Sequence, residues 1–332
     1  MFRVALVGCG TIGSVHAAGY LRMANATLVG IVDIRENHGR KMAKRFDTQW
    51  YSSLQQILEA EEVDVVDVCV PTYLHRSIVE QAARAGKHVI CEKPIARTLD
   101  DAEAIIRICS EYGIRLFIAQ VLRFFPQYRQ THELLEAGAM GSVGTARAMR
   151  GGGFPQGWND WYASVERSGT LVVDMIIHDF DFLRWCFGEV QRVYAKGLLG
   201  RELNRLDHAF VSLRFQNGVI AHVEGTWAYP SGFRTMLEVA GTEGVLEHRS
   251  DEEMPIHLSL RQNGTETGGV AVPESPLDKD PYQLELEHFL SCIETASDAL
   301  VTPHDAYKAL EISLAALKSI QTGEPVELGG SM

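Results

Sequence analysis

An apolar run at residues 2–7 leads directly into a glycine-rich turn, Gly8-Cys9-Gly10-Thr11-Ile12-Gly13, and then into a helical segment at 14–23. A strand, a G-x-G-x-x-G turn and a helix in this order are the fingerprint of a dinucleotide-binding unit. Gly8 allows the tight turn, Gly10 lets the backbone approach a pyrophosphate, and Gly13 lets helix and strand pack closely. Free N–H groups at the helix start would then face the phosphates. The sequence therefore predicts a nicotinamide dinucleotide site.

The second apolar run, Thr27 to Val32, ends at Asp33. A carboxylate at this point would bind the adenosine ribose hydroxyls and repel a 2′-phosphate, which favours NAD. Arg35 leaves NADP as the alternative cofactor, because a guanidinium could pair with a 2′-phosphate. The stretch Asp33-Ile34-Arg35-Glu36 also resembles a capping box that opens the next helix, and both interpretations can hold.

Length and charge limit the classes of partner. The chain has 332 residues, enough for two domains, and a formal net charge of −12, which disfavours a nucleic acid or an anionic membrane. No apolar run is long enough to span a bilayer, and the strand that begins at residue 2 leaves no room for a signal peptide. The six cysteines are scattered without a C-x-x-C pair. We therefore expect a reduced, cytoplasmic protein without membrane or nucleic-acid partners.

Residues 1 to about 120 alternate short apolar strands with helices, which is the pattern of a parallel sheet covered on both faces. The run at 63–70 is almost wholly apolar, as a buried central strand should be. We predict an α/β fold whose first domain, residues 1–121, is a Rossmann doubly wound parallel sheet that binds NAD(P).

After residue 121 this alternation stops. Several later segments alternate apolar and polar residues, and Asn217-Gly218 between two of them is a strong hairpin signal. We predict that residues 122–332 form an α+β domain with a large, mostly antiparallel sheet, which binds substrate. The second face of that sheet needs cover, so we also expect a homodimer or homotetramer.

In an open parallel sheet, ligands bind at the carboxyl ends of the strands. The loops that follow the predicted strands should therefore gather on one edge and hold the cofactor. The candidate cofactor-binding residues in these loops are Gly8, Gly10, Thr11, Ile12, Gly13, Asp33, Ile34, Arg35, Pro71, Thr72, His75, Glu92 and Lys93. Lys93 is fixed by the proline that follows it, although an ordinary surface lysine is the simpler interpretation.

A helix predicted at about 171–187 carries a polar stripe on an otherwise apolar surface. Asp174, His178 and Asp181 fall on one face of it, and buried polar groups need a reason. Asp174 and His178 could simply satisfy each other as an i,i+4 pair. A divalent metal site is a second alternative, but the sequence offers no dedicated set of further ligands, so we predict no metal.

Two stretches resemble the signatures of the glucose–fructose oxidoreductase and inositol dehydrogenase family (Gfo/Idh/MocA). They are Gly-Lys-His-Val-Ile-Cys-Glu-Lys-Pro-Ile-Ala at 86–96 and the segment from Ser168 to Asp181, with its D-x-x-x-H-x-x-D pattern. Pro71 to His75, Arg123-Phe124 and Thr302-Pro303 also match, so the resemblance covers nearly the whole chain. One departure is Ser168-Gly169-Thr170, where the family usually has two or three glycines, and these side chains could narrow the substrate pocket.

The resemblance implies a catalytic set of Lys93, Asp174 and His178. It implies reversible oxidation of a secondary alcohol of a polyol or sugar, with hydride passing to or from nicotinamide. His178 would take the hydroxyl proton, Asp174 would orient the imidazole, and Lys93 would stabilise charge on the reacting oxygen. The resemblance also permits Lys93 itself as the acid/base.

Substrate contacts are expected from the second domain. The candidate substrate-binding residues are Arg123, Trp158, Trp161, Asp174 and His178. The aromatic residues could stack on a sugar or belong to the core, and Arg123 could be a surface ion pair; His16 and Trp227 are weaker candidates. Two other functions stay open: an enzyme that retains its nucleotide for sugar oxidoreduction or glycoside elimination, and a non-catalytic NAD(H) sensor.

Overall fold

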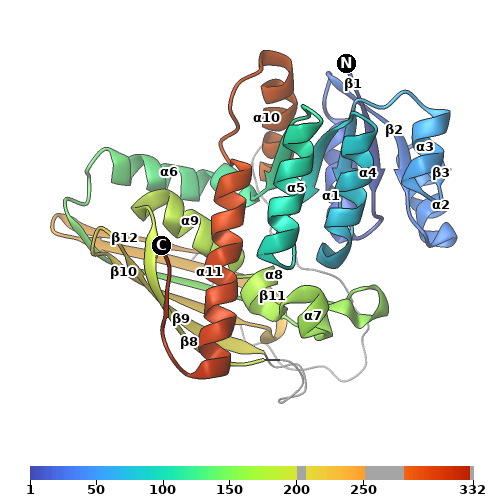
Figure 1. The fold of residues 1–332 in the computed structure, drawn as a ribbon. Coiled ribbons are helices and arrows are strands. Elements are labelled where there is room, and N and C mark those ends of the chain that lie inside the picture. The colour runs from blue at the N-terminus through green and yellow to red at the C-terminus, as the bar shows by residue number, and fades with distance from the viewer. Residues whose placement is uncertain (200–206, 251–279, 330–332) are drawn as a thin grey trace. The chain divides into compact units, whose positions relative to one another are not determined.

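The computed structural model describes residues 1–199, 207–250 and 280–329 (Figure 1). The chain forms two compact units. One comprises Met1–Phe124 and Glu274–Tyr307, and the other comprises Phe125–Pro273 and Lys308–Met332. The boundary predicted after residue 121 lies close to the first division, but a later segment of the chain returns to the first unit.

The first unit is built on a six-stranded parallel sheet in the order β3-β2-β1-β4-β5-β6. Its strands are β1 (Phe2–Val7), β2 (Ala26–Val32), β3 (Trp50–Tyr51), β4 (Val65–Val68), β5 (His88–Glu92) and β6 (Leu116–Ala119). The helices that alternate with them are α1 (Thr11–Leu21), α2 (Glu36–Arg45), α3 (Leu54–Ala60), α4 (His75–Arg84) and α5 (Leu99–Glu111). The strand order reverses between β1 and β4, which is where open α/β sheets bind their ligands.

Helix α10 (Pro281–Thr295) completes the interior of the first unit. Its buried side chains Leu286, Phe289 and Leu290 join the core that β1 and β6 line. Phe289 stacks on Phe117 of β6 with ring centroids 5.0 Å apart. Because these apolar side chains repeat at helical spacing, burying them requires the surface that α1 and β6 present, although the sequence predicted this helix as part of the second domain.

The second unit is built on a seven-stranded sheet in the order β12-β11-β7-β10-β9-β8-β13. Among the described strands of this second sheet, only β7 and β10 pair in parallel, so the sheet is mixed and mostly antiparallel. The strands are β7 (Val143–Gly153), β8 (Val190–Leu198), β9 (His208–Phe215), β10 (Ile220–Thr226), β11 (Ala228–Gly241), β12 (Gly244–Arg249) and β13 (Val326–Glu327). The helices are α6 (Pro126–Glu136), α7 (Val165–Ser168), α8 (Thr170–Asp174), α9 (Ile177–Phe187) and most of α11 (Pro303–Thr322). The predicted fold class is confirmed.

The strands of the second sheet alternate as the sequence predicted, and Asn217-Gly218 forms the hairpin between β9 and β10. In β9, Ala209, Val211 and Leu213 are at most 1% exposed, whereas Phe210 between them is 55% exposed. Tyr194 of β8 and Ile220 of β10 are also exposed. One face of the sheet therefore lies on a core, and the other shows large apolar side chains to solvent.

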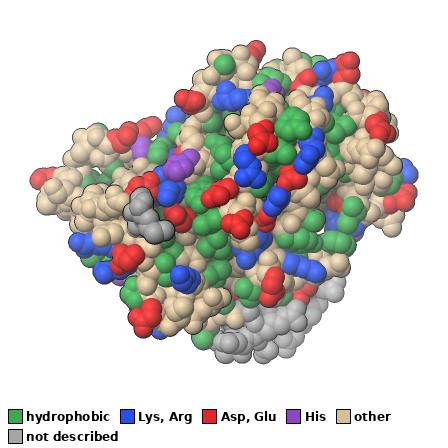
Figure 2. Space-filling model, in the orientation of Figure 1, with side chains coloured by type: hydrophobic (Ala, Val, Ile, Leu, Met, Phe, Trp, Pro, Cys, Tyr) green, Lys and Arg blue, Asp and Glu red, His purple; other side chains and the backbone are tan. Residues whose placement is uncertain are grey.

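No helix in the described ranges is both long and apolar enough to cross a membrane. On the face of the molecule shown in Figure 2, acidic and basic side chains are interspersed.

We expect the exposed sheet face to be buried in a homo-oligomer, because exposed aromatic and aliphatic side chains on a sheet favour association. Phe210→Glu should place a charge at this face and lower the mass measured by light scattering, with unchanged circular dichroism. Leu134→Glu, at an exposed apolar position of α6, is the matched control and should leave the mass unchanged. A wild-type protein that is monomeric at micromolar concentration would contradict this expectation.

Candidate functional site

The glycine-rich turn between β1 and α1 has the geometry that a dinucleotide requires. Gly8 has a φ of +111°, and a Cβ there would lie 2.4 Å from the carbonyl oxygen of Cys69. A Cβ on Gly13 would lie 2.1 Å from the carbonyl oxygen of Gly8. A Cβ on Gly10 would meet no atom within 4 Å. Gly8 and Gly13 are thus needed for packing, whereas Gly10 faces open space beside the start of α1, where a pyrophosphate fits.

Asp33, directly after β2, is 7% exposed and accepts hydrogen bonds from the backbone N–H groups of Cys9 and Arg35 at 2.9 and 2.8 Å. The Arg35 guanidinium binds both carboxylate oxygens, at 3.0 and 2.9 Å. Burial by itself raises the pKa of Asp33, but the hydrogen bonds from Arg35 and Cys9 outweigh it and hold that pKa below its usual range. The carboxylate is therefore ionised and forms an ion pair with Arg35, and its binding of a ribose diol stays a prediction.

The capping-box interpretation of this stretch is wrong. Helix α2 begins at Glu36, its N-cap is Arg35, and no side chain caps it. Asp33 instead accepts from the N–H of Arg35, two residues on, because its carboxylate faces the glycine-rich turn.

The loops after β4 and β5 are tied together by His75, the first residue of α4. Its Nδ1 and Nε2 lie 2.9 Å from the carbonyl oxygens of Pro94 and Val70, and burial lowers the pKa of this histidine. Glu92, at the end of β5, accepts a hydrogen bond from the backbone N–H of Lys93 at 3.0 Å. Lys93 itself is partly exposed.

The predicted cofactor-binding residues follow strands whose carboxyl ends are in register. Val7 pairs with both Val32 and Val68, and Val68 pairs with Cys91. The glycine-rich turn, Asp33, Pro71 and Lys93 are therefore brought to one edge of the first sheet, on both sides of its switch point. These residues fit a nicotinamide dinucleotide.

In the second unit, the predicted helix at 171–187 is divided into α8 and α9. The N–H of Ile176 donates to the carbonyl of Leu171, five residues back, and a tighter turn follows at Asp179. Leu171 and Ile176 pack where Gly225 of β10 lacks a side chain; a Cβ there would lie 2.7 Å from both. Asp174 ends α8 and His178 lies in the first turn of α9, so they do not share one regular helix as the spacing predicted.

Sequence reasoning missed the ion pair that fixes the start of α9. Asp179, next to His178, receives two hydrogen bonds from Arg150 of β7, at 2.8 and 2.9 Å, and both side chains are at most 5% exposed. Burial lowers the pKa of Arg150, but the charge of Asp179 more than offsets this, so the guanidinium stays charged. Arg150 follows Ala146 and Ala148 on the inward face of β7. A charged residue at a position where the alternation predicts a buried apolar one was the sequence signal for a buried ion pair.

The remaining substrate candidates differ in exposure. Trp158 is 39% exposed, whereas Trp161 is 7% exposed. The ring centroids of Trp161 and Tyr162 lie 4.0 Å apart. Arg123 is 2% exposed, and its guanidinium donates to the carbonyl of Leu300 at 2.9 Å within the first unit. The meeting of Lys93 in the first unit with Asp174 and His178 in the second stays a prediction.

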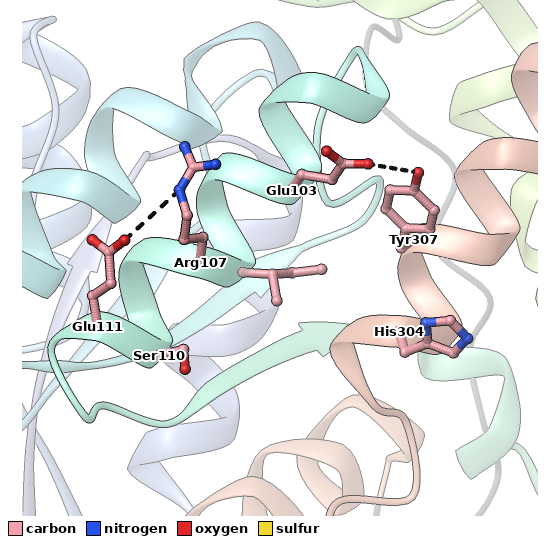
Figure 3. Close-up of a pocket in the computed structure, with 7 residues that line it drawn as sticks. Glu103, Arg107, Ser110, Glu111, His304 and Tyr307 are labelled. Atoms are coloured by element: carbon pink, nitrogen blue, oxygen red, sulfur yellow. Dashed lines mark hydrogen bonds and ion pairs between the residues drawn. The ribbon is translucent and has the colours of Figure 1, made fainter.

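A surface groove between α5 and the start of α11 lies apart from these residues. Figure 3 shows Glu103 bound to Tyr307 across it and Arg107 beside Glu111. It is lined by Glu103, Ile106, Arg107, Ser110, Glu111, His304 and Tyr307, and none of these is a predicted site residue.

Known proteins resemble the chain over its full length. Residues 2–120 match the model of an oxidoreductase family with an NAD-binding Rossmann fold, GFO/IDH/MocA, and residues 128–247 match that family's C-terminal domain. The chain is 29% identical to myo-inositol 2-dehydrogenase of Thermotoga maritima over 98% of both proteins. It is 30% identical to 1,5-anhydro-D-fructose reductase of Ensifer adhaerens over 99% of both. The crystal structure of GenD2 from gentamicin A biosynthesis, in complex with NAD, is similar with a TM-score of 0.88 and 25% identity, covering 99% of this chain and 97% of that one.

The ion pair between Asp33 and Arg35 leads to a prediction about cofactor choice. Asp33→Asn removes the negative charge and releases the guanidinium, so the ratio of kcat/KM with NAD to that with NADP should fall by at least about tenfold. Any increase of kcat/KM with NADP in Asp33→Asn should be lost in the double variant Asp33→Asn/Arg35→Ala, which lacks the released guanidinium.

Glu36→Gln is the control, because this carboxylate is exposed and pairs with Arg40 instead. The ratio should stay at the wild-type value in this variant. An unchanged ratio in Asp33→Asn would show that Asp33 does not select the cofactor.

Proposed function

This chain belongs to the GFO/IDH/MocA family of NAD-binding oxidoreductases, and we propose that it interconverts a secondary alcohol and a ketone on a polyol or sugar. The observation that carries the proposal is the single sheet edge that collects the glycine-rich turn, Asp33 and Lys93. The substrate class is supported by relatives named for an inositol and an anhydro sugar.

The nicotinamide ring, when bound, accepts or supplies the hydride. Alcohol oxidation also releases the hydroxyl proton, and the side chains must handle it. We assign the proton to His178, because imidazole exchanges protons near neutral pH. Asp174 would orient the imidazole and stabilise its charged form. Lys93 would hydrogen-bond the reacting oxygen and stabilise the negative charge that develops there.

The support for these roles is partial exposure combined with firm anchoring. Lys93, Asp174 and His178 are all partly exposed, so a ligand can reach them. Lys93 follows a carboxylate that holds its backbone, and His178 precedes Asp179, which the buried Arg150 fixes. Reactive groups on rigid supports are what efficient positioning requires.

Ser168 and Thr170, which replace family glycines, are proposed to affect substrate choice. The Ser168 hydroxyl donates to carbonyls of Tyr162 and Ser164 at 2.9 and 3.0 Å and so shapes the preceding loop. Thr170 has a φ of +61°, an unfavourable conformation for a β-branched residue. Such strain is retained where the surrounding structure demands it.

Replacing the proposed acid/base should abolish most turnover without loss of NAD binding. His178→Ala should lower kcat by about 10²–10⁴, the usual contribution of a general base, while the dissociation constant for NAD stays within about threefold. Steady-state rates and tryptophan-fluorescence titration measure the two quantities. His304→Ala, at an exposed histidine near the start of α11, is the control and should retain wild-type kcat. Turnover within a few-fold of wild type in His178→Ala would exclude His178 as the base.

The pH dependence of kcat separates His178 from Lys93 as proton acceptor. If His178 is the base, the profile of kcat against pH for Lys93→Met should still rise or fall near neutral pH. If Lys93 is the base, this change of kcat near neutral pH should be lost in the variant.

The reaction itself is tested by NADH formation with inositols, aldoses and sugar acids, each with NAD and NADP. Protein that purifies with stoichiometric nucleotide and needs none added would favour the retained-cofactor alternative.

A further inference from the structure

A cluster of buried polar side chains lies behind the glycine-rich turn in the first unit. It contains His16 and Tyr20 of α1, Asp67 of β4, Cys69 and Glu92, and each is at most 7% exposed. Neither the fold nor the proposed mechanism requires polar groups here. Buried polar side chains are costly unless their interactions compensate for lost hydration, so the cluster needs an explanation.

His16 lies between two carboxylates. Its Nδ1 is 2.9 Å from Asp67 Oδ2, and its Nε2 is 3.2 Å from Glu92 Oε1. Nε2 makes no hydrogen bond of regular geometry to a described residue, and its contact with Glu92 is an ion pair when the ring is protonated. Tyr20 donates its hydroxyl to the same Asp67 oxygen at 2.9 Å. The ring therefore joins the ends of β4 and β5 to the helix that follows the glycine-rich turn.

The surroundings favour the charged form of this ring. Burial by itself lowers the pKa of His16, but the charge of Asp67 and its hydrogen bond to the ring act in the opposite direction, and the pKa lies well above its usual value. Helix α10 adds Tyr282 and Glu285 to the groups that face the cluster. Burial raises the pKa of both Tyr20 and Tyr282, so the two phenols stay neutral. The ring lies between the two carboxyl side chains and directs one nitrogen at each of them.

The cluster reaches Lys93 through Glu92. One oxygen of Glu92 faces His16, and the other accepts the backbone N–H of Lys93 at 3.0 Å. Both oxygens of the Glu92 carboxylate are therefore held in place. The carboxylate in turn holds the backbone of Lys93, from which the lysine side chain extends. A displacement of about 1 Å at a reacting group can cost about 10²-fold in rate.

We propose that His16 is a positioning residue, whose ring bridges Asp67 and Glu92 and thereby holds Lys93 in its working place beside the glycine-rich turn. This inference rests on the proposed role of Lys93 in the reaction. Helix α1 would then have two roles: its start would bind the phosphates of the cofactor, and its residue His16 would position Lys93.

A metal ion is the competing explanation. His16, Asp67 and Cys69 each offer a ligand atom within 4.8 Å of the others. These atoms are already engaged, however, since Asp67 accepts from Tyr20 and the Cys69 thiol donates to Asp67 at 3.4 Å. Elemental analysis of the purified protein decides between the two.

The kinetic test uses His16→Gln, Glu92→Gln and the double variant. Each single variant should lower kcat by at least about tenfold, and His16→Gln should keep the NAD dissociation constant within about threefold. The double variant should be no slower than the slower single one, because both changes break one connection. Tyr20→Phe, which removes a bond to Asp67 but leaves the contact between His16 and Glu92, should keep kcat within about twofold. Rate losses that multiply, or equal losses in Tyr20→Phe, would overturn the proposal.

A second measurement needs no catalysis and observes the ring in the wild-type protein. In wild-type protein labelled with ¹⁵N-histidine, the His16 ring, assigned by its loss in His16→Gln, should carry protons on both nitrogens at pH 8. A neutral ring at pH 8, or a stoichiometric metal lost in Cys69→Ala, would overturn the proposal. Wild-type protein that binds NAD but oxidises no polyol would overturn the proposed function, and the ring signals would then decide the bridge by themselves.

Discussion

The close approach of the chain to itself around Gly8 is the constraint on which the first unit depends. Gly8 meets the carbonyl of Cys69, and Gly13 meets the carbonyl of Gly8, at distances that exclude any side chain. This contact joins β1, its turn and the end of β4, which are the elements on either side of the switch point. A Cβ on Gly10, between these two packed glycines, would meet no atom within 4 Å. The same residues thus provide the packing of the sheet and the room for a pyrophosphate.

The buried ionisable side chains described above in the first unit have their partners close by. Asp33 is satisfied by Arg35 and two backbone N–H groups, and His16 is enclosed by carboxylates. Ionised groups that are buried persist only with such partners. If Asp33 binds the ribose as the sequence predicts, the ribose must compete with Arg35 for the carboxylate.

The features that the sequence predicted well are local ones. The glycine-rich turn, the alternation of strand and helix, and the Asn217-Gly218 hairpin are each encoded within a few neighbouring residues. The features that it did not predict depend on partners far along the chain. The division between α8 and α9 depends on Gly225, and the anchoring of Asp179 depends on Arg150. Neither His16 nor Asp67 indicates by itself that a ring will lie between two carboxylates, because their contact spans two elements.

Helix α10 has a consequence for how the protein is made. Its side chains Leu286 and Phe289 belong to the core of the first unit, yet they leave the ribosome long after Phe117 does. At ordinary elongation rates, roughly 10–30 s separate the synthesis of the last strand of that sheet from that of α10. During this interval the nascent dinucleotide-binding unit exposes the apolar surface of α1 and β6. A fragment that stops at residue 124 would keep that surface uncovered, so residues 1–124 alone are not an independently excisable module even though they contain the complete sheet.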